Sequence, residues 1–137
     1  MYVATGSSLQ FLALDASSGK LKFKYDMKVG GFSSAALAGG MAYVGNFNGR
    51  LYAFDTAVGR PAWEFQTESS KRDALDVLND DGSWNQGSLG AATFFDFQDM
   101  YVVMYRRFSV GAILSSPVVD KGAVYFDSTD GSVYALQ

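Results

Sequence analysis

The sequence predicts an all-β fold built from repeated antiparallel sheets, because one strand–turn–strand phrase occurs three times in 137 residues. The phrase reads YVATGSSLQFLALD at 2–15, YVGNFNGRLYAFD at 43–55 and YFDSTDGSVYALQ at 125–137. The first two copies end 40 residues apart, whereas the third follows after another repeat length plus an insertion. A period near 40 residues with four short strands per unit is typical of a β-propeller blade.

Four strands are expected in each complete unit. The predicted first strands are 33–37 and 115–119, the second 41–45 and 123–126, the third 51–55 and 133–136, and the fourth 21–25 and 62–65. Asn48-Gly49 and Asp130-Gly131 separate the second strand from the third. These pairs supply the positive φ angles that a tight hairpin turn needs, so they indicate hairpins.

Alternation along the third strand assigns its two faces. Leu51 and Ala53 fall on one face and Phe54 on the other, and both faces are apolar. This pattern is expected when each sheet lies between two neighbouring sheets. We therefore predict a partial β-propeller of four-stranded antiparallel blades, one complete and two incomplete, with a helical insertion.

The number of repeats raises the question of how the outer sheets are covered. A closed propeller needs on the order of 240–320 residues at this period. Open strand edges and uncovered apolar faces favour pairing with another chain. We expect either a fragment of a longer propeller or a chain that assembles with itself, and we favour a fragment, with self-association as a consequence.

The β pattern is interrupted between the predicted propeller segments, which are 1–65 and 114–137. The insertion, 66–113, is expected to hold two helices, at 73–78 and 97–108. A capping box from Ser70 to Asp73 would open the first, and Asp96 would cap the second.

The second predicted helix carries an apolar stripe at helical spacing. We expect this stripe to pack on the blades; the alternative is a recognition element, because long insertions in repeat scaffolds often carry function. The candidate partner-binding residues are Trp84, Tyr101, Tyr105 and Arg106.

Composition excludes several kinds of chemistry. The chain has no histidine and no cysteine, which excludes a Ser-His-Asp triad, disulfides and zinc–thiolate sites. A net charge of −3 without a basic stripe argues against nucleic acid. No apolar run reaches the length of a membrane span, and no targeting signal is visible. The segment 79–82, Asn-Asp-Asp-Gly, is better explained as a turn than as a calcium loop, since both ends of such a loop fail.

A second motif follows the third strand of the first two repeats. It consists of an aspartate, a glycine four residues later and an aromatic residue eight residues later. The two copies are Asp15, Gly19 and Phe23, and Asp55, Gly59 and Trp63. The motif resembles the tryptophan-docking motif of pyrroloquinoline-quinone-like (PQQ-like) β-propellers. A kelch propeller, the structural alternative, requires a double glycine where this chain has Gly45-Asn46.

The resemblance implies a role for each motif residue. In PQQ-like propellers the aromatic docks against the neighbouring blade, and the glycine turns the chain before the fourth strand. Phe23 departs from the usual tryptophan, which implies a weaker contact in that copy.

The resemblance also bears on function. The enzymatic branch of the family holds PQQ with calcium, a cysteine disulfide, a stacking tryptophan and a catalytic aspartate, and this chain matches none of these by motif. We therefore predict no catalytic residue, cofactor or metal. The favoured function is a non-enzymatic protein-interaction scaffold of the periplasm or cell envelope, binding polypeptide or itself through open strand edges. The alternatives are a fragment of a PQQ-dependent quinoprotein dehydrogenase and a structural segment without a ligand of its own.

Overall fold

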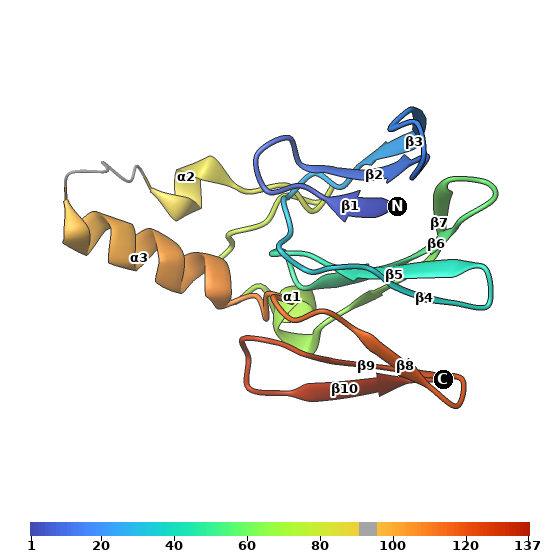
Figure 1. The fold of residues 1–137 in the computed structure, drawn as a ribbon. Helices are drawn as coiled ribbons and strands as arrows, with labels where there is room; N and C mark the ends of the chain where they lie inside the picture. Colours follow the sequence, from blue (N-terminus) through green and yellow to red (C-terminus); the bar gives the residue numbers. More distant parts are fainter. Residues whose placement is uncertain (91–95) are drawn as a thin grey trace.

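The computed structural model describes residues 1–90 and 96–137 and contains three antiparallel sheets side by side (Figure 1). The first sheet, in the order β1–β2–β3, consists of β1 (Tyr2–Ala4), β2 (Gln10–Leu14) and β3 (Leu21–Asp26). The second, in the order β4–β5–β6–β7, consists of β4 (Ala36–Ala38), β5 (Met41–Gly45), β6 (Arg50–Asp55) and β7 (Arg60–Gln66). The third, in the order β10–β9–β8, consists of β8 (Val118–Asp120), β9 (Ala123–Asp127) and β10 (Val133–Leu136). Residues 91–95, which belong to the predicted insertion, lie outside the described residues.

The second, third and fourth strands match the sequence prediction closely, whereas the first strands begin later than predicted. β4 and β8 each begin three residues into the predicted range. The serines before them make side-chain contacts instead of ladder hydrogen bonds. The Ser33 hydroxyl accepts a hydrogen bond from the Gly45 backbone N–H at 3.2 Å, and the Ser34 N–H donates to the Ser116 hydroxyl at 3.0 Å. Serine hydroxyls compete for backbone partners in this way, which shortens the ladder.

The fourth strands pair with the third strands in the same register in both repeats. Phe23 lies opposite Ala13 in the first sheet, and Trp63 lies opposite Ala53 in the second. Each pairing shifts register directly after that alanine. Both alanines are buried, so a small residue faces a large ring at the same place in each sheet.

Strand β6 is covered on both of its faces, as its alternation predicts. Phe54 belongs to a core between the first and second sheets, together with Phe11 and Met27. Leu51 belongs to a second core with Ile113 and residues of the third sheet. Both Phe54 and Leu51 are fully buried, which confirms the prediction of a sheet lying between two others.

Three helices lie in the described part of the segment between β7 and β8: α1 (Glu68–Arg72), α2 (Gln86–Leu89) and α3 (Phe97–Phe108). The helix predicted at 73–78 is wrong. Thr67, not Ser70, caps α1, and Asp73 ends it in the left-handed conformation. The Thr67 hydroxyl accepts from the Ser70 N–H at 3.2 Å and donates to the Val110 carbonyl at 2.9 Å, which anchors the helix start in the interior.

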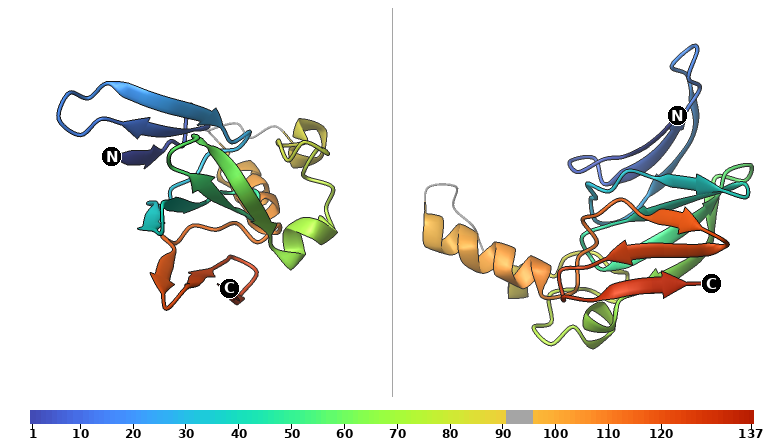
Figure 2. Two further views of the ribbon diagram at one scale, coloured as in Figure 1. Left: turned by 90° about the vertical axis from the view of Figure 1, so that its right-hand side faces the viewer. Right: turned by 60° about the horizontal axis from the view of Figure 1, so that its bottom comes forward.

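Helix α3 has the predicted bounds, and its predicted cap is present. The Asp96 carboxylate accepts hydrogen bonds from the backbone N–H groups of Gln98 and Asp99. The helix projects away from the three sheets (Figures 1 and 2). The expected packing of its apolar stripe on the blades is wrong. Only Val103, which is not part of the stripe, is buried in α3.

Candidate protein-interaction surfaces

The first copy of the docking motif places Phe23 against the next sheet. A β-carbon built on Gly59 would lie 2.6 Å from Cγ of Phe23, so the glycine turn receives the ring directly. Gly59 has a φ of +77°, a conformation that glycine adopts without strain. The Phe23 ring also lies 6.3 Å from the ring of Phe11, centroid to centroid. Phe23 therefore contacts the turn of the second sheet and the core of its own.

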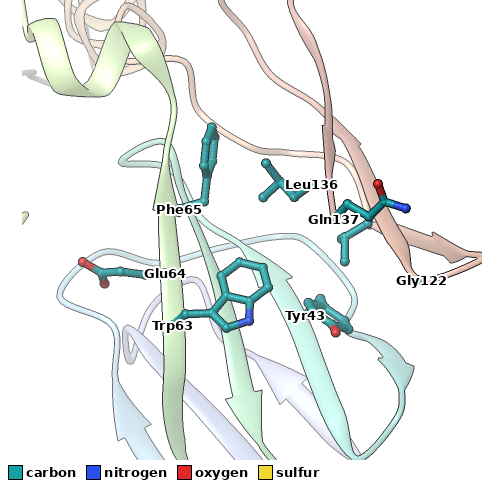
Figure 3. Close-up of a pocket in the computed structure, with 8 residues that line it drawn as sticks. Tyr43, Trp63, Glu64, Phe65, Gly122, Leu136 and Gln137 are labelled. Atoms are coloured by element: carbon teal, nitrogen blue, oxygen red, sulfur yellow. The ribbon is translucent and has the colours of Figure 1, made fainter.

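The second copy places Trp63 at a groove between the second and third sheets. The groove has a volume of about 450 Å³ and is lined by Tyr43, Trp63, Glu64, Phe65, Gly122, Val124, Leu136 and Gln137. Figure 3 shows Trp63 and Phe65 on the side of β7 that faces Leu136, with Glu64 on the other side. The indole ring of Trp63 lies 5.8 Å from the Tyr43 ring and is 40% exposed.

The floor of the groove is rigidly packed. Phe65 contacts Phe126 and Tyr134 edge to face, with centroid distances of 5.8 and 5.2 Å. Tyr134 stacks on Phe126 at 5.2 Å. Such aromatic pairs add to the free energy gained by burying their area. Because its floor is already held in place, the groove needs little reordering to accept an apolar ligand.

One side of the groove is bounded by a strand edge. Among the described strands, β10 pairs only with β9, so the backbone groups along its outer edge have no ladder partner. In the second sheet the corresponding position beside β6 is filled by β7. Val133, on β10, is 78% exposed. An apolar groove beside an unpaired edge suits an extended polypeptide, which offers both backbone groups and side chains.

The motif aspartates close turns. Oδ1 of Asp15 accepts hydrogen bonds from the hydroxyls and backbone N–H groups of Ser17 and Ser18. The Ser17 hydroxyl, followed by the other donors, holds the pKa of Asp15 well below its usual range. Asp55 accepts from the N–H groups of Ala57 and Val58 at 2.8 and 3.0 Å. This arrangement is typical of Asx turns, and the two carboxylates act separately.

The four candidate partner residues divide into two pairs. Tyr101 and Tyr105 are exposed on α3 and stack with centroids 6.5 Å apart. Trp84 is half-buried beneath the guanidinium of Arg107, and Arg106 donates a hydrogen bond to the Ser88 carbonyl. Trp84 and Arg106 thus lie where α3 meets the rest of the chain, whereas the tyrosines face solvent.

The acidic segment at 79–82 forms a turn. The Gly82 N–H donates to the Asn79 carbonyl at 2.8 Å, and Asp81 accepts from the hydroxyl and N–H of Ser83. These contacts, the hydroxyl first, lower the pKa of Asp81. Among residues 1–90 and 96–137, no three carboxylates meet in a way that would hold a metal ion.

The groove is the feature that sequence reasoning missed. Alternation along β7 places Trp63 and Phe65 on one face, and that signal is present in the sequence. Gly122, Val124 and Leu136 come from a sheet more than fifty residues further along the chain, so the spacing of residues does not reveal that they face Trp63.

The stacked sheets and the repeated aspartate–glycine–aromatic turn define a PQQ-like β-propeller. A family profile described as "Outer membrane protein assembly factor BamB" matches residues 1–84. The chain belongs to this family of PQQ-like repeats, as the docking motif predicted. None of the described helices has the length and apolarity that crossing a membrane requires.

Individual relatives fall into two groups. Outer membrane protein assembly factor BamB of Moranella endobia (strain PCIT) is 27% identical over 124 residues, which cover 90% of this chain and 31% of that protein. The dehydrogenase subunit of the alcohol dehydrogenase (quinone) of Gluconobacter oxydans (strain 621H) is 38% identical over 78 residues, which cover 49% of this chain and 10% of that subunit. The crystal structure of BamB from Moraxella catarrhalis matches in fold, with a TM-score of 0.50 at 16% identity, over 98% of this chain and 45% of that one. The chain thus spans less than half the length of each of these relatives.

Proposed function

We propose that the chain is a non-enzymatic scaffold segment that binds polypeptide in the bacterial cell envelope, and that the Trp63 groove beside β10 is its binding site. The observation that carries the proposal is the apolar groove next to an unpaired strand edge. The relationship to outer membrane protein assembly factors supports both the role and the compartment.

The ligand is an extended strand that carries an aromatic side chain. Its backbone pairs antiparallel with β10, as β7 pairs with β6. Its aromatic residue lies opposite Ala135, the position that corresponds to Ala13 and Ala53 in the other two sheets. Because Ala135 and Leu136 point to opposite faces of β10, this aromatic residue lies on the face away from the groove, and the side chains next to it in the ligand meet Trp63 and Leu136.

A labelled peptide with the sequence of residues 59–66 tests this proposal, because that segment contains the strand that fills the corresponding position in the second sheet. Fluorescence anisotropy should show saturable binding to the chain, and Trp63→Ala should weaken it roughly tenfold or more. Leu37→Ala, which removes an exposed apolar side chain elsewhere, is the control. Binding that Trp63→Ala leaves unchanged, or no binding at all, refutes the proposed site.

The sequence similarity to the quinone-dependent dehydrogenase subunit suggests a second candidate function, in which the chain is a segment of an oxidoreductase. The described residues do not fit PQQ with calcium. They bring no three carboxylates together, and the sequence has no cysteine. We therefore assign no step to that cofactor. Under the scaffold proposal, PQQ with calcium leaves the melting temperature unchanged, and an increase would favour the oxidoreductase.

A further inference from the structure

Helix α3 is attached by the side opposite its apolar stripe. The attachment uses Val103, the hydrogen bond from Arg106 to the Ser88 carbonyl, and the stacking of Arg107 on Trp84 at 5.6 Å. The stripe consequently faces solvent. Its exposed residues are Phe97, Met100, Tyr101, Met104 and Tyr105.

Helix α3 exposes several large apolar side chains along one side. Phe97, Tyr101 and Tyr105 are 79%, 62% and 61% exposed. Each aromatic ring of this kind buries on the order of 150 Å² or more when it is covered. A continuous exposed stripe of this size marks an interaction site. This surface is separate from the Trp63 groove and does not depend on the function proposed above.

Charges at the two ends of α3 indicate what covers the stripe. Asp96 and Asp99 lie at its N-terminal end, and Arg106 and Arg107 lie in its last turn. An interfacial membrane helix carries lysine and arginine along its polar face, whereas this helix and its cap together carry two acidic and two basic residues, which are grouped at opposite ends. Two copies of the helix that run antiparallel, by contrast, bring each acidic end beside the basic end of the other copy.

Arg107 supplies a second observation. Its guanidinium lies over the ring of Trp84, and no ion pair among the described residues involves it. At 3.6 residues per turn, positions 96 and 107 project from the helix in directions only about 20° apart. When two copies of a helix are related by a twofold axis and run antiparallel, a residue at one end of the first copy lies next to the residue that is on the same side of the helix but at the other end of the second copy. Asp96 of one copy therefore meets Arg107 of the other.

We propose that the chain forms a homodimer through an antiparallel pair of α3 helices. Tyr101 and Met104 lie next to the twofold axis, and Phe97 of one copy faces Phe108 of the other. Asp96 and Arg107 pair at each end. The interface is thus apolar in its centre and charged at its rim, which is the usual organisation of protein–protein interfaces.

Sedimentation equilibrium tests the dimer. The chain should have twice the mass of 14.8 kDa, and the double substitution Tyr101→Glu with Tyr105→Glu should give a monomer. Val133→Glu, which places the same charge on an exposed site of β10, should leave the dimer intact. Circular dichroism shows whether each variant is folded. Asp96→Asn keeps the helix cap and removes the charge, so it should weaken the dimer roughly threefold to tenfold.

Cross-linking tests the orientation, because the chain has no cysteine of its own. A mixture of the Phe97→Cys and Phe108→Cys chains should form the mixed disulfide on oxidation, and each chain alone should form little. A predominance of Phe97→Cys homodimers indicates parallel helices and overturns the proposal. A monomeric wild type, or a dimer that Val133→Glu dissociates and the tyrosine substitutions do not, overturns it equally. Peptide binding at the Trp63 groove is measured separately, so either proposal can fail alone.

Discussion

The ring of Phe11 lies on the ring of Phe54, with centroids 4.3 Å apart and planes inclined by 23°. Phe11 belongs to β2 and Phe54 to β6, so this stacked pair joins the first sheet to the second. Both side chains are fully buried. The two residues are not equivalent in the repeat. Phe11 corresponds to Leu51 in the repeat. The face of the first sheet that carries Phe11 therefore packs on the face of the second sheet that carries Phe54, and the face that carries Leu51 packs on the third sheet.

Removal of one ring of this pair should lower the stability of the protein strongly. We expect Phe54→Ala to lower the free energy of unfolding by about 3–5 kcal/mol, because it removes a buried ring and leaves a cavity between two sheets. Urea denaturation followed by tyrosine fluorescence measures the change. Val133→Ala, on an exposed site, should have little effect. A loss for Phe54→Ala as small as that of the control would show that the sheets are not joined through this ring.

The Phe23–Gly59 contact can be tested with a matched pair of glycines. Gly19 and Gly59 occupy the same position in the motif and have φ angles of +69° and +77°, but only Gly59 has a neighbour within 4 Å. Alanine at either site incurs about 1–2 kcal/mol of backbone strain. Gly59→Ala must also displace Phe23, so we expect it to be destabilising by roughly 1–3 kcal/mol more than Gly19→Ala. Equal melting temperatures for the two variants would contradict a docked Phe23.

Thr67 should be sensitive to loss of its hydroxyl. The side chain is fully buried, caps α1 and bonds to the Val110 carbonyl. Thr67→Val keeps the shape and removes both contacts, and we expect a loss of about 1–3 kcal/mol. Thr67→Ser retains the hydroxyl and should recover most of it. Thermal denaturation compares the three proteins, and indistinguishable Thr67→Val and Thr67→Ser variants would argue against the hydrogen bonds.

Because of Tyr52, we expect the protein to lose stability in alkali. Burial, assisted by the negative charge of Glu64, raises the pKa of Tyr52 from 10.0 to about 12. A raised pKa in the folded state means that the stabilisation is complete below pH 10 and is lost as the pH rises towards 12. The loss is on the order of 2 kcal/mol. Urea denaturation across this pH range should show a smaller decline in the free energy of unfolding for Tyr52→Phe than for the wild type. The same decline in both proteins would refute the prediction.

The repeat made most of the fold predictable from sequence, and the insertion shows where the prediction failed. Asn48-Gly49 and the alternation around it place β5 and β6 almost to the residue, because turn chemistry and strand period agree. Capping signals placed α3 correctly and α1 incorrectly. Ser70 and Thr67 both have a capping hydroxyl, and only the contact of Thr67 with Val110, more than forty residues away, decides between them.

The direction of the α3 stripe could not be predicted for a similar reason. Periodicity shows that a helix has an apolar side, but it does not show which side contacts the rest of the chain. The stacking of Arg107 on Trp84 fixes which side of α3 contacts the rest of the chain, and the two residues of that contact are far apart in sequence. The groove beside Trp63 likewise depends on residues from a sheet much later in the chain.

The alanines opposite Phe23 and Trp63 have a consequence for how such a chain tolerates change. Each lies between two aromatic residues in the ladder, Tyr2 and Phe23 in the first sheet and Tyr43 and Trp63 in the second, so a small residue in the third strand leaves room for a large ring on each side. A larger residue in place of either alanine would have to displace both rings at once. The third strand thus limits change at this level of each sheet, whereas the aromatic residue of the fourth strand can differ between neighbouring sheets, as phenylalanine and tryptophan do here.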